Sequence, residues 1–412
     1  MADVANNLNA LHKTVFNDGV PDLVPKVAKL QSEFPFSSEK KLGDFYEMPV
    51  RLALPSGFTH EIANGTAGVY SLNDAKGGTT SKAKIYAYQT NLRDQMSLED
   101  AAKCTGDAAS YKKGAAFFFE GMNKGARKRI ETNLLYGQVG VGIVQTYTSG
   151  DPSVVISLKE WAPQIWSGMK GAEIDVMNGT TSTVRASVTI AGIDIESRKL
   201  TLSATVSGAA ANDVIYFKGG YGKELVGIHK TLSNTGSLHE IDAAVYDNWK
   251  SVQHALSSQA LSFKGVKKAI AKCVGKGLMD DVVLFCNPLG WDDIQEDIMS
   301  LRTVEKSEVR RIEIGNEEIV YVSQNGATRI VSHPMVKEGY AYGLCKPYWK
   351  RIGVCDFDLG TPGLPGGQKD DKVWFDIPGK SGIEARGYTA QAIYSEMPGV
   401  SFMISGIVNT TT

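Results

Sequence analysis

Alternating apolar and polar positions predict a β-hairpin near the beginning of the chain. Between residues 45 and 54, apolar side chains recur at every second position, which is the period of a strand. Pro49 lies inside this run and lacks a backbone N–H, so we expect the strand to lie at an edge. A second strand is predicted over residues 82–92, which are rich in tyrosine, threonine and isoleucine. The two runs together predict a long hairpin.

The tip of this hairpin, residues 55–83, contains few large apolar side chains. Ordering a residue costs ~1–2 kcal/mol of backbone entropy, and so few apolar side chains cannot offset that cost by burial. The tip is therefore either mobile or held by contacts outside the subunit, and the sequence leaves both open. Its large apolar side chains are Phe58, Ile62, Val69, Tyr70 and Leu72.

A four-residue period of apolar positions predicts a long helix over residues 98–136. Ser97 and Asp100 form a capping pattern at its start, and Gly106 and Gly114 favour a kink. The helix is basic, which is typical of a solvated outer face, with contact to an acidic neighbour as the alternative. Its apolar positions are Phe118, Met122, Ala126, Ile130 and Leu134.

The rest of the chain predicts an α+β organisation. Short alternating runs between residues 171 and 218 indicate a small β module. After Leu261, helical and strand patterns alternate, and the Gly-, Pro- and Asp-rich residues 356–380 are typical of an exposed loop. The later predicted elements are helices 263–273 and 291–299, strands 282–286, 318–322, 328–332 and 341–344, and mixed strands over 383–407.

Composition and charge narrow the function classes. The 412 residues contain 44 Lys+Arg and 45 Asp+Glu, a net charge of −1, which argues against a protein that coats nucleic acid through a general basic excess. No apolar run is long enough to span a membrane, and no secretory signal is predicted. Five cysteines without a Cys-x-x-Cys pair predict reduced thiols and neither a disulfide framework nor a zinc site.

The sequence contains no clear phosphate-binding or metal-binding motif. Residues 219–224, Gly-Gly-Tyr-Gly-Lys-Glu, lack the first glycine and the Ser/Thr of a phosphate-binding loop and favour a turn. The six histidines have no metal-ligand spacing, and His333-Pro334 is typical of a turn. We therefore predict no catalytic, cofactor or metal site, although residues distant in sequence can form one.

Several segments, in this order, resemble the major capsid (head) proteins of tailed bacteriophages. The resemblance covers about residues 15–355, and the order and spacing of the segments carry it. The segments are Gly19–Pro25, Met48–Arg51, Leu134–Gln138, Glu160–Trp166, Asn287–Trp291, Glu338–Tyr342 and Trp349–Gly353.

The resemblance implies the α+β capsid-shell fold of tailed phages and herpesviruses. That fold has an N-terminal arm, an extended loop, a peripheral domain with a long spine helix, and an axial domain, and here we also expect a β-rich insertion. The implied boundaries are an arm at 1–43, an extended loop at 44–95, a peripheral domain at 96–150, a β-rich segment or insertion at 151–240, an axial domain at 241–300, and strands returning to the axial and peripheral domains at 301–412.

The same resemblance implies a structural subunit, not an enzyme. Copies would form pentamers and hexamers of an icosahedral head in the virion, assembled in the host cytoplasm around DNA that is not bound sequence-specifically. Implied partners are a separate scaffolding protein, a portal protein and a decoration protein, with no cofactor and no membrane.

Two kinds of residue are candidates for contacts between subunits. Both the hairpin tip and the basic helix are features that neighbouring copies would complete. The alternatives are a soluble α+β enzyme with a β-rich accessory module, and another virion or surface-layer structural protein. The candidate contact residues are Phe58, Tyr70, Leu72, Lys112, Lys113, Arg127 and Lys128.

Overall fold

The computed structural model describes residues 28–37, 43–61, 70–103, 114–302, 318–323, 326–359 and 374–410. They fall into two compact units. Unit 1 contains residues 91–103, 114–127, 357–359 and 374–388 of the described chain, and unit 2 contains the rest. Within the described ranges, no helix has both the length and the apolar character needed to cross a bilayer.

A six-stranded mixed sheet forms one core of unit 2. Its strand order is β13-β21-β17-β14-β16-β15, and the continuous apolar run of β14 lies in the interior, where both faces are buried. The six strands are Val252–Gln259 (β13), Val282–Cys286 (β14), Glu318–Ser323 (β15), Gly326–Ser332 (β16), Tyr340–Cys345 (β17) and Phe402–Ile407 (β21).

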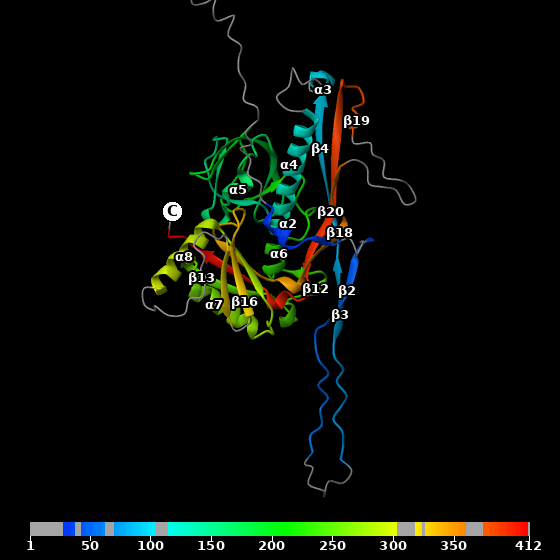
Figure 1. Ribbon diagram of the computed structural model, residues 1–412, viewed down its shortest axis with the longest axis vertical. Helices are drawn as coiled ribbons and strands as arrows, with labels where there is room; N and C mark the ends of the chain where they lie inside the picture. Colours follow the sequence, from blue (N-terminus) through cyan, green and yellow to red (C-terminus); the bar gives the residue numbers. More distant parts are fainter. Residues whose placement is uncertain are drawn as a thin grey trace, which may run out of the picture. The chain divides into compact units, whose positions relative to one another are not determined.

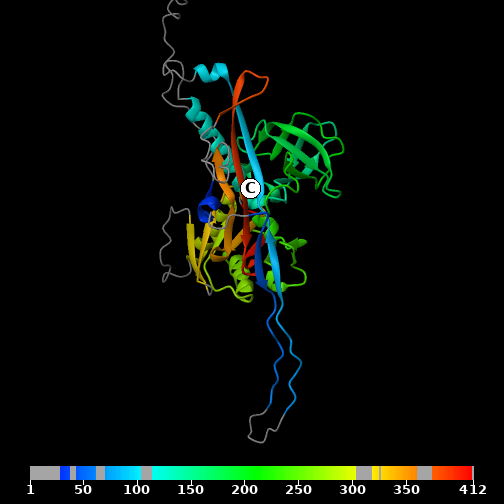
Figure 2. The ribbon, with the colours of Figure 1, turned by 90° about the vertical axis from the view of Figure 1, so that its right-hand side faces the viewer.

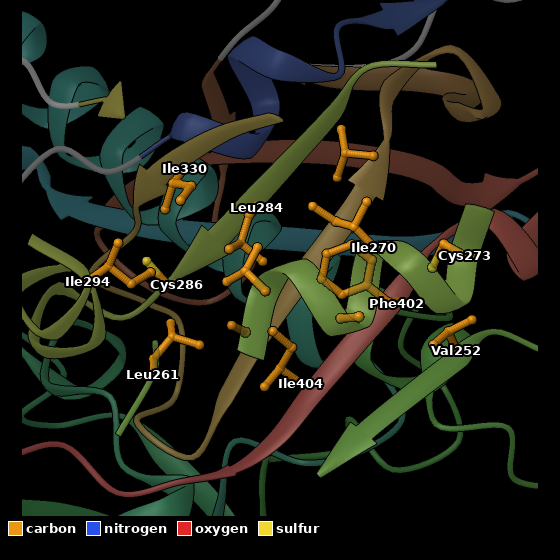
Figure 3. Packing of buried hydrophobic residues seen from close by; sticks show 14 of the residues in the cluster. Val252, Leu261, Ile270, Cys273, Leu284, Cys286, Ile294, Ile330, Phe402 and Ile404 are labelled. Carbon is orange, nitrogen blue, oxygen red and sulfur yellow. The ribbon is translucent and has the colours of Figure 1, made fainter. Parts of the chain in front are cut away.

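Two helices, α7 (Phe263–Val274) and α8 (Pro288–Arg302), pack on this sheet. α7 begins where the Ser262 hydroxyl accepts a hydrogen bond from the Gly265 N–H, and its apolar period points one face inward. Figure 3 shows Ile270 of α7 beside Phe402 of β21 in this cluster. The predicted helices and strands of this region are confirmed.

The β-rich segment of unit 2 is a closed barrel with strand order β10-β5-β6-β9-β8-β7, seen as the green ring in Figure 2. The predicted β module is confirmed, and it begins earlier than expected, at Gly142. The strands are Gly142–Tyr147 (β5), Ser153–Ile156 (β6), Glu173–Met177 (β7), Val184–Asp194 (β8), Lys199–Leu202 (β9) and Val214–Phe217 (β10).

The segment that holds the barrel starts and ends at one place. The Gly227 N–H donates to the Gly137 carbonyl at 3.2 Å, and a Cβ at Gly137 would lie 2.1 Å from the Leu225 carbonyl oxygen. Only glycine permits such close backbone approach. The 89 residues between Gly137 and Gly227 therefore leave and rejoin unit 2 at adjacent points, as expected of an inserted module.

The predicted hairpin is confirmed by β2 (Tyr46–Arg51) and β3 (Thr80–Ile85), which pair antiparallel with Met48 opposite Ala83. The single second strand predicted over 82–92 is wrong in its extent, because residues 88–92 belong to a separate strand, β4 (Tyr88–Ser97), of another sheet. Strands β2 and β3 form a sheet of their own, so Pro49 lies at a free edge as predicted. One face packs into a second core cluster: Met48, Leu52, Ala83, Ile85, Ile241, Ala243, Trp249, Ile352, Ala392 and Tyr394.

Shorter elements complete unit 2. Helix α2 (Lys29–Glu33) lies within the segment predicted as the arm, and β1 (Phe36–Ser37) pairs parallel with β18 (Trp349–Leu359). The others are α5 (Pro163–Trp166), α6 (Ile228–Leu232), β11 (Ser237–Leu238), β12 (Ile241–Asp242) and the 3-10 turns Leu158–Glu160 (η1), Asp247–Trp249 (η2), Lys346–Tyr348 (η3) and Pro398–Val400 (η4).

Unit 1 contains most of β4 (Tyr88–Ser97), α3 (Leu98–Lys103), the first part of α4 (Gly114–Tyr136), β19 (Trp374–Asp376) and part of β20 (Gly382–Ser395). β20 pairs with both β19 and β4. The rings of Phe118 and Phe119 lie 5.2 and 5.0 Å from that of Trp374. The α4, β4, β18 and β20 elements pass from one unit into the other, with residues 88–90 of β4 in unit 2.

Two sequence predictions need correction or restriction. Residues 356–359, predicted as loop, continue strand β18, and residues 374–376 form β19, because both pair with β20. The helix predicted over 98–136 corresponds to α3 and α4. Of the two expected kink positions, Gly106 lies outside the described residues and Gly114 is the first residue of α4.

Candidate intersubunit surfaces

The distal part of the hairpin makes no buried contact of its own. Beyond β2 and β3, every described side chain of 53–61 and 70–79 is exposed except the half-buried Thr59. Figure 1 shows these residues drawn out beyond the rest of unit 2. The hairpin is therefore anchored at its base and unsupported beyond it.

The last pair of the hairpin ladder joins Ala53 and Thr79, which donate to each other's carbonyls at 3.2 Å; the Leu52 N–H also donates to the Thr79 carbonyl at 2.8 Å, which is a β-bulge. Beyond it, the described chains are joined by the Ser56 N–H to the Lys76 carbonyl and by Asn73, whose amide groups reach Thr59 Oγ1 at 2.8 Å and the Phe58 carbonyl at 2.7 Å. Each such bond adds only ~1 kcal/mol net in water. A few such bonds join the two sides of the hairpin to each other, but they do not fix the hairpin against the rest of unit 2.

Apolar side chains occupy this unsupported stretch. Leu54, Phe58 and Leu72 are 72%, 71% and 76% exposed, and Tyr70 is 50% exposed. Four large apolar residues are thus exposed on one narrow projection, which makes it a candidate contact surface. The predicted contact residues Phe58, Tyr70 and Leu72 thus lie together on one structure.

The charges near the hairpin base are paired within the chain. Lys82 Nζ lies 3.1 Å from Glu47, and Lys84 Nζ lies 2.9 Å from Glu240. The hydrogen bond to Glu240 raises the pKa of Lys84, so this lysine stays protonated and is a poor nucleophile. These pairs are exposed and add little stability, but they orient the root of the hairpin.

The cations of α4 do not form the free basic face that the sequence suggests. Lys128 is only 9% exposed, and its Nζ donates to the Ser167 carbonyl, so the prediction of a solvated Lys128 is wrong. Burial lowers the pKa of Lys128 to about 8. Arg129 stacks on the Phe217 ring at 3.5 Å and lies 3.6 Å from Glu224.

Of the other predicted contact cations, Arg127 is exposed and its Nε donates to Asn123 Oδ1 at 3.0 Å. Lys112 and Lys113 lie outside the described residues. The structure thus places the three apolar contact residues on one hairpin of unit 2, whereas Arg127 belongs to unit 1.

A buried carboxylate binds residues 30 and 31, which lie within the segment predicted as the arm. Glu131 of α4 is fully buried and accepts the Leu30 N–H at 2.6 Å, the Gln31 N–H at 3.3 Å and the Gln31 side-chain amide at 3.0 Å. His333 Nε2 lies 2.9 Å from the same carboxylate, and its Nδ1 accepts the Met335 N–H at 3.1 Å. Because Nδ1 is an acceptor, the proton is on Nε2 and donates to Glu131.

A buried ion pair joins the barrel segment to the turn that precedes β17. Lys337 Nζ lies 2.6 Å from Glu160 Oε2, 3.0 Å from the Gly140 carbonyl and 4.3 Å from the centre of the Tyr136 ring. Burial alone would raise the pKa of Glu160, but the Lys337 ammonium and the hydrogen bonds from Lys337 and Tyr340 outweigh it and lower the pKa.

Sequence reasoning did not single out Glu131, Glu160 or Lys337. Their partners are 100 to 202 residues away in the chain, so no local pattern marks them. His333 was interpreted as a turn residue; its N–H does donate to the Cys286 carbonyl at a turn, but its ring serves the buried pair.

The described residues show little reactive chemistry. They contain no group of three or more His, Cys, Asp or Glu side chains able to hold a metal ion. Burial raises the pKa of Cys273 and of Cys345 to about 12, so these thiols remain protonated and unreactive at neutral pH. The features that stand out are surfaces and anchors for protein contacts.

Solved structures share this architecture. The chain matches one from the Cyanophage A-1(L) capsid asymmetric unit with a TM-score of 0.59 and 10% identity, covering 97% of this chain and 99% of that chain. It matches the capsid of a native GTA particle (TM-score 0.50, 8% identity, 99% of each chain) and the capsid of Myoviridae Phage XM1 (TM-score 0.50, 9% identity, 98% of each chain). Neither a family model nor a curated protein sequence matches.

These full-length likenesses show that the chain has the α+β fold of phage capsid shells. The fold implied by the sequence resemblance is therefore confirmed.

Proposed function

We propose that this chain is the major capsid protein of a tailed bacteriophage. Many copies form the pentamers and hexamers of an icosahedral head that encloses the phage DNA, and the role is structural, without catalysis. The capsid fold supports this proposal. In this role the protein resides in the virion after assembly in the host cytoplasm.

The observation that carries the proposal is the exposed hairpin. Its base is buried in the core cluster around Met48 and Ile85, whereas Leu54, Phe58, Tyr70 and Leu72 face solvent. Burying a large apolar side chain yields ~1.5–3 kcal/mol, so four of them supply a substantial contact when a second copy covers them. The hairpin thus extends onto an adjacent subunit, and Phe58, Tyr70 and Leu72 make the contact.

The remaining parts take the roles that the resemblance implies. The six-stranded sheet with α7 and α8 belongs to the axial domain, and α4 is the spine helix of the peripheral domain. The barrel is the insertion, which the close contact of Gly137 with Gly227 supports. A scaffolding protein directs assembly, a portal protein occupies one vertex, and a decoration protein binds the finished shell.

The hairpin can be removed at a defined place. Because Ala53 and Thr79 exchange both hydrogen bonds, an Asn-Gly turn can replace residues 54–78 and close β2 onto β3. We expect the shortened chain to fold, with an unchanged circular dichroism spectrum and a cooperative thermal transition, but to remain as free subunits or small rings in negative-stain micrographs. Closed shells from the shortened chain would contradict the role of the hairpin, and tubes or flat sheets from the full chain would contradict an icosahedral head.

Point variants make the test specific. Phe58→Ser with Leu72→Ser removes two exposed apolar side chains without touching a buried group, so stability should change by less than about 0.5 kcal/mol. Shell yield should fall at least tenfold. Met279→Gln is the matched control, because Met279 is exposed and apolar but lies outside the hairpin.

A further inference from the structure

The outward face of α7 carries a row of lysines. Lys264, Lys267, Lys268 and Lys272 are all exposed, while Val266, Ala269, Ile270 and Cys273 of the same helix are buried against the sheet. No acidic residue occurs in α7. The helix therefore presents four positive charges along one convex face.

These four ammonium groups have no partner among the residues that the structure describes. No ion pair or hydrogen bond joins them to a described side chain or carbonyl, whereas Lys276, just beyond the helix, pairs with Asp247 at 3.1 Å. The neighbouring carboxylate of Asp297 is engaged with the Phe263 N–H at 2.8 Å. In a chain whose net charge is only −1, such a concentration of unpaired positive charge identifies a binding surface for a polyanion.

The neighbourhood of the row is open and partly aromatic. Phe263 and Tyr321 pack edge to face with ring centres 4.4 Å apart, and they line a hollow of about 720 Å³ together with Lys264, Lys267 and Lys268. A bound polyanion can thus approach the lysines without displacing a side chain of the described core.

The spacing of the lysines suits a phosphate chain. At ~1.5 Å per residue, Lys264 and Lys272 lie about 12 Å apart along the helix, a distance over which one strand of B-DNA presents three to four phosphates at about 3.4 Å each. All four groups are lysines, which act as point charges, and the face contains no arginine, asparagine or glutamine to read bases. A convex helix also suits the surface of a duplex, whereas an acidic helical peptide is typically held in a groove.

We propose that the Lys264–Lys272 face of α7 binds the phosphate backbone of the enclosed DNA, without sequence preference. The inference rests on the proposed function, because the shell is what brings DNA to the subunit. This proposal agrees with the near-neutral net charge of the chain, because the positive charge that would attract DNA is confined to one helix.

The test measures DNA binding on unassembled full-length subunits. A fluorescent mixed-sequence 30-base-pair duplex is titrated at several NaCl concentrations, and the slope of log K against log [salt] is determined. Each lysine removed should reduce that slope by about 0.9, so Lys264→Gln with Lys268→Gln and Lys272→Gln should reduce it by nearly 3. The control is Lys170→Gln with Lys223→Gln and Lys380→Gln, three exposed lysines on other elements, which should leave the slope unchanged.

The outcomes separate this inference from the proposed function. No DNA binding by the wild-type subunit, an unchanged slope in the α7 variant, or an equal loss in the control would overturn the inference. Polyglutamate that displaces the duplex at lower charge concentration than unlabelled DNA would also overturn it, since the face would then favour an acidic polypeptide. Shell formation is scored independently by microscopy, so a failure of the full chain to assemble contradicts the proposed function and leaves the binding measurement intact.

Discussion

The carboxylate of Glu131 accepts the backbone N–H of Leu30 at 2.6 Å, which joins helix α4 to a segment 101 residues earlier in the chain. Leu30 lies in the first turn of the short helix α2, where backbone N–H groups lack partners within the helix. A buried negative charge at this place both satisfies those groups and interacts favourably with the helix dipole. The Glu131 side chain thus fixes where residues 28–37 run on unit 2.

Replacing that carboxylate should release the segment. Glu131→Gln removes the charge and turns one acceptor into a donor facing Gln31, so the free energy of unfolding should fall by about 2–4 kcal/mol. Hydrogen exchange should show the Leu30 and Gln31 amides losing protection while the β14 amides keep theirs. Arg127→Gln, on the exposed side of the same helix, is the control. Retained protection of Leu30 would refute the anchoring role.

The buried pair of Lys337 and Glu160 should behave as one unit. Lys337→Met leaves a buried carboxylate without its cation and should cost about 3–5 kcal/mol of unfolding free energy, measured by urea denaturation of free subunits. Adding Glu160→Gln to that variant should restore part of the loss, because the remaining amide oxygen still accepts from Tyr340. Strictly additive effects of the two substitutions would show that the pair is not coupled.

Stability should depend on pH through Glu338. Burial raises the pKa of this carboxyl to about 7, although Arg198 partly opposes the shift. The folded state therefore binds a proton that the unfolded state releases above its ordinary pKa of about 4.5, and stability is lost as pH rises from about 4.5 to 7. Glu338→Gln should remove this loss, so the difference in melting temperature between wild type and variant should grow from pH 5 to pH 7.5. A constant difference would contradict it.

His229 acts with the opposite sign. Burial, helped by the Lys337 charge, lowers its pKa to about 4, against the opposing charge of Glu160. The unfolded state therefore binds more protons between about pH 6.5 and 4, so acidification through that range destabilises the subunit. His229→Gln, which can still bond the Tyr342 hydroxyl, should flatten the acid side of the stability curve.

Close packing inside the six-stranded sheet gives a steric prediction. A Cβ at Gly343 would lie 2.1 Å from Cζ of Phe402, so Gly343→Ala should lower the unfolding free energy by about 1–3 kcal/mol or more. Combining it with Phe402→Leu should recover part of that loss by removing the ring. Gly121→Ala, in α4 with open space around the Cβ position, should instead stabilise by up to about 1 kcal/mol.

Local sequence patterns were sufficient to predict those helices and strands whose structure is determined by residues nearby in the sequence. The Ser262 cap and the apolar period of α7 are contained within a few residues, and so is the continuous apolar run of β14. The hairpin could also be predicted from local sequence. The alternation of apolar and polar positions predicts β2, and Pro49 predicts that this strand lies at an edge.

Long-range pairing explains what the sequence did not show. Residues 356–359 contain two aspartates that are typical of a loop, yet they form a strand because β20 pairs beside them. Lys128 looked like part of a solvated face, but the Ser167 carbonyl, 39 residues later, receives its ammonium inside the subunit. Of the candidate contact surface, the hairpin was predictable from its lack of apolar partners, whereas the anchors at Glu131 and Lys337 depend on distant residues.

The Ala53–Thr79 pair has a mechanical consequence. Past this pair the two described extended segments, residues 54–61 and 70–78, run on for roughly 25 Å at about 3.3 Å per residue with only a few hydrogen bonds between them, so they form a tether that bends at small energetic cost. If the hairpin binds a neighbouring subunit as proposed, that contact can persist while the angle between the two subunits changes. The same polypeptide could then form both the pentamers and the hexamers of the proposed shell, with the change in curvature taken up by the hairpin.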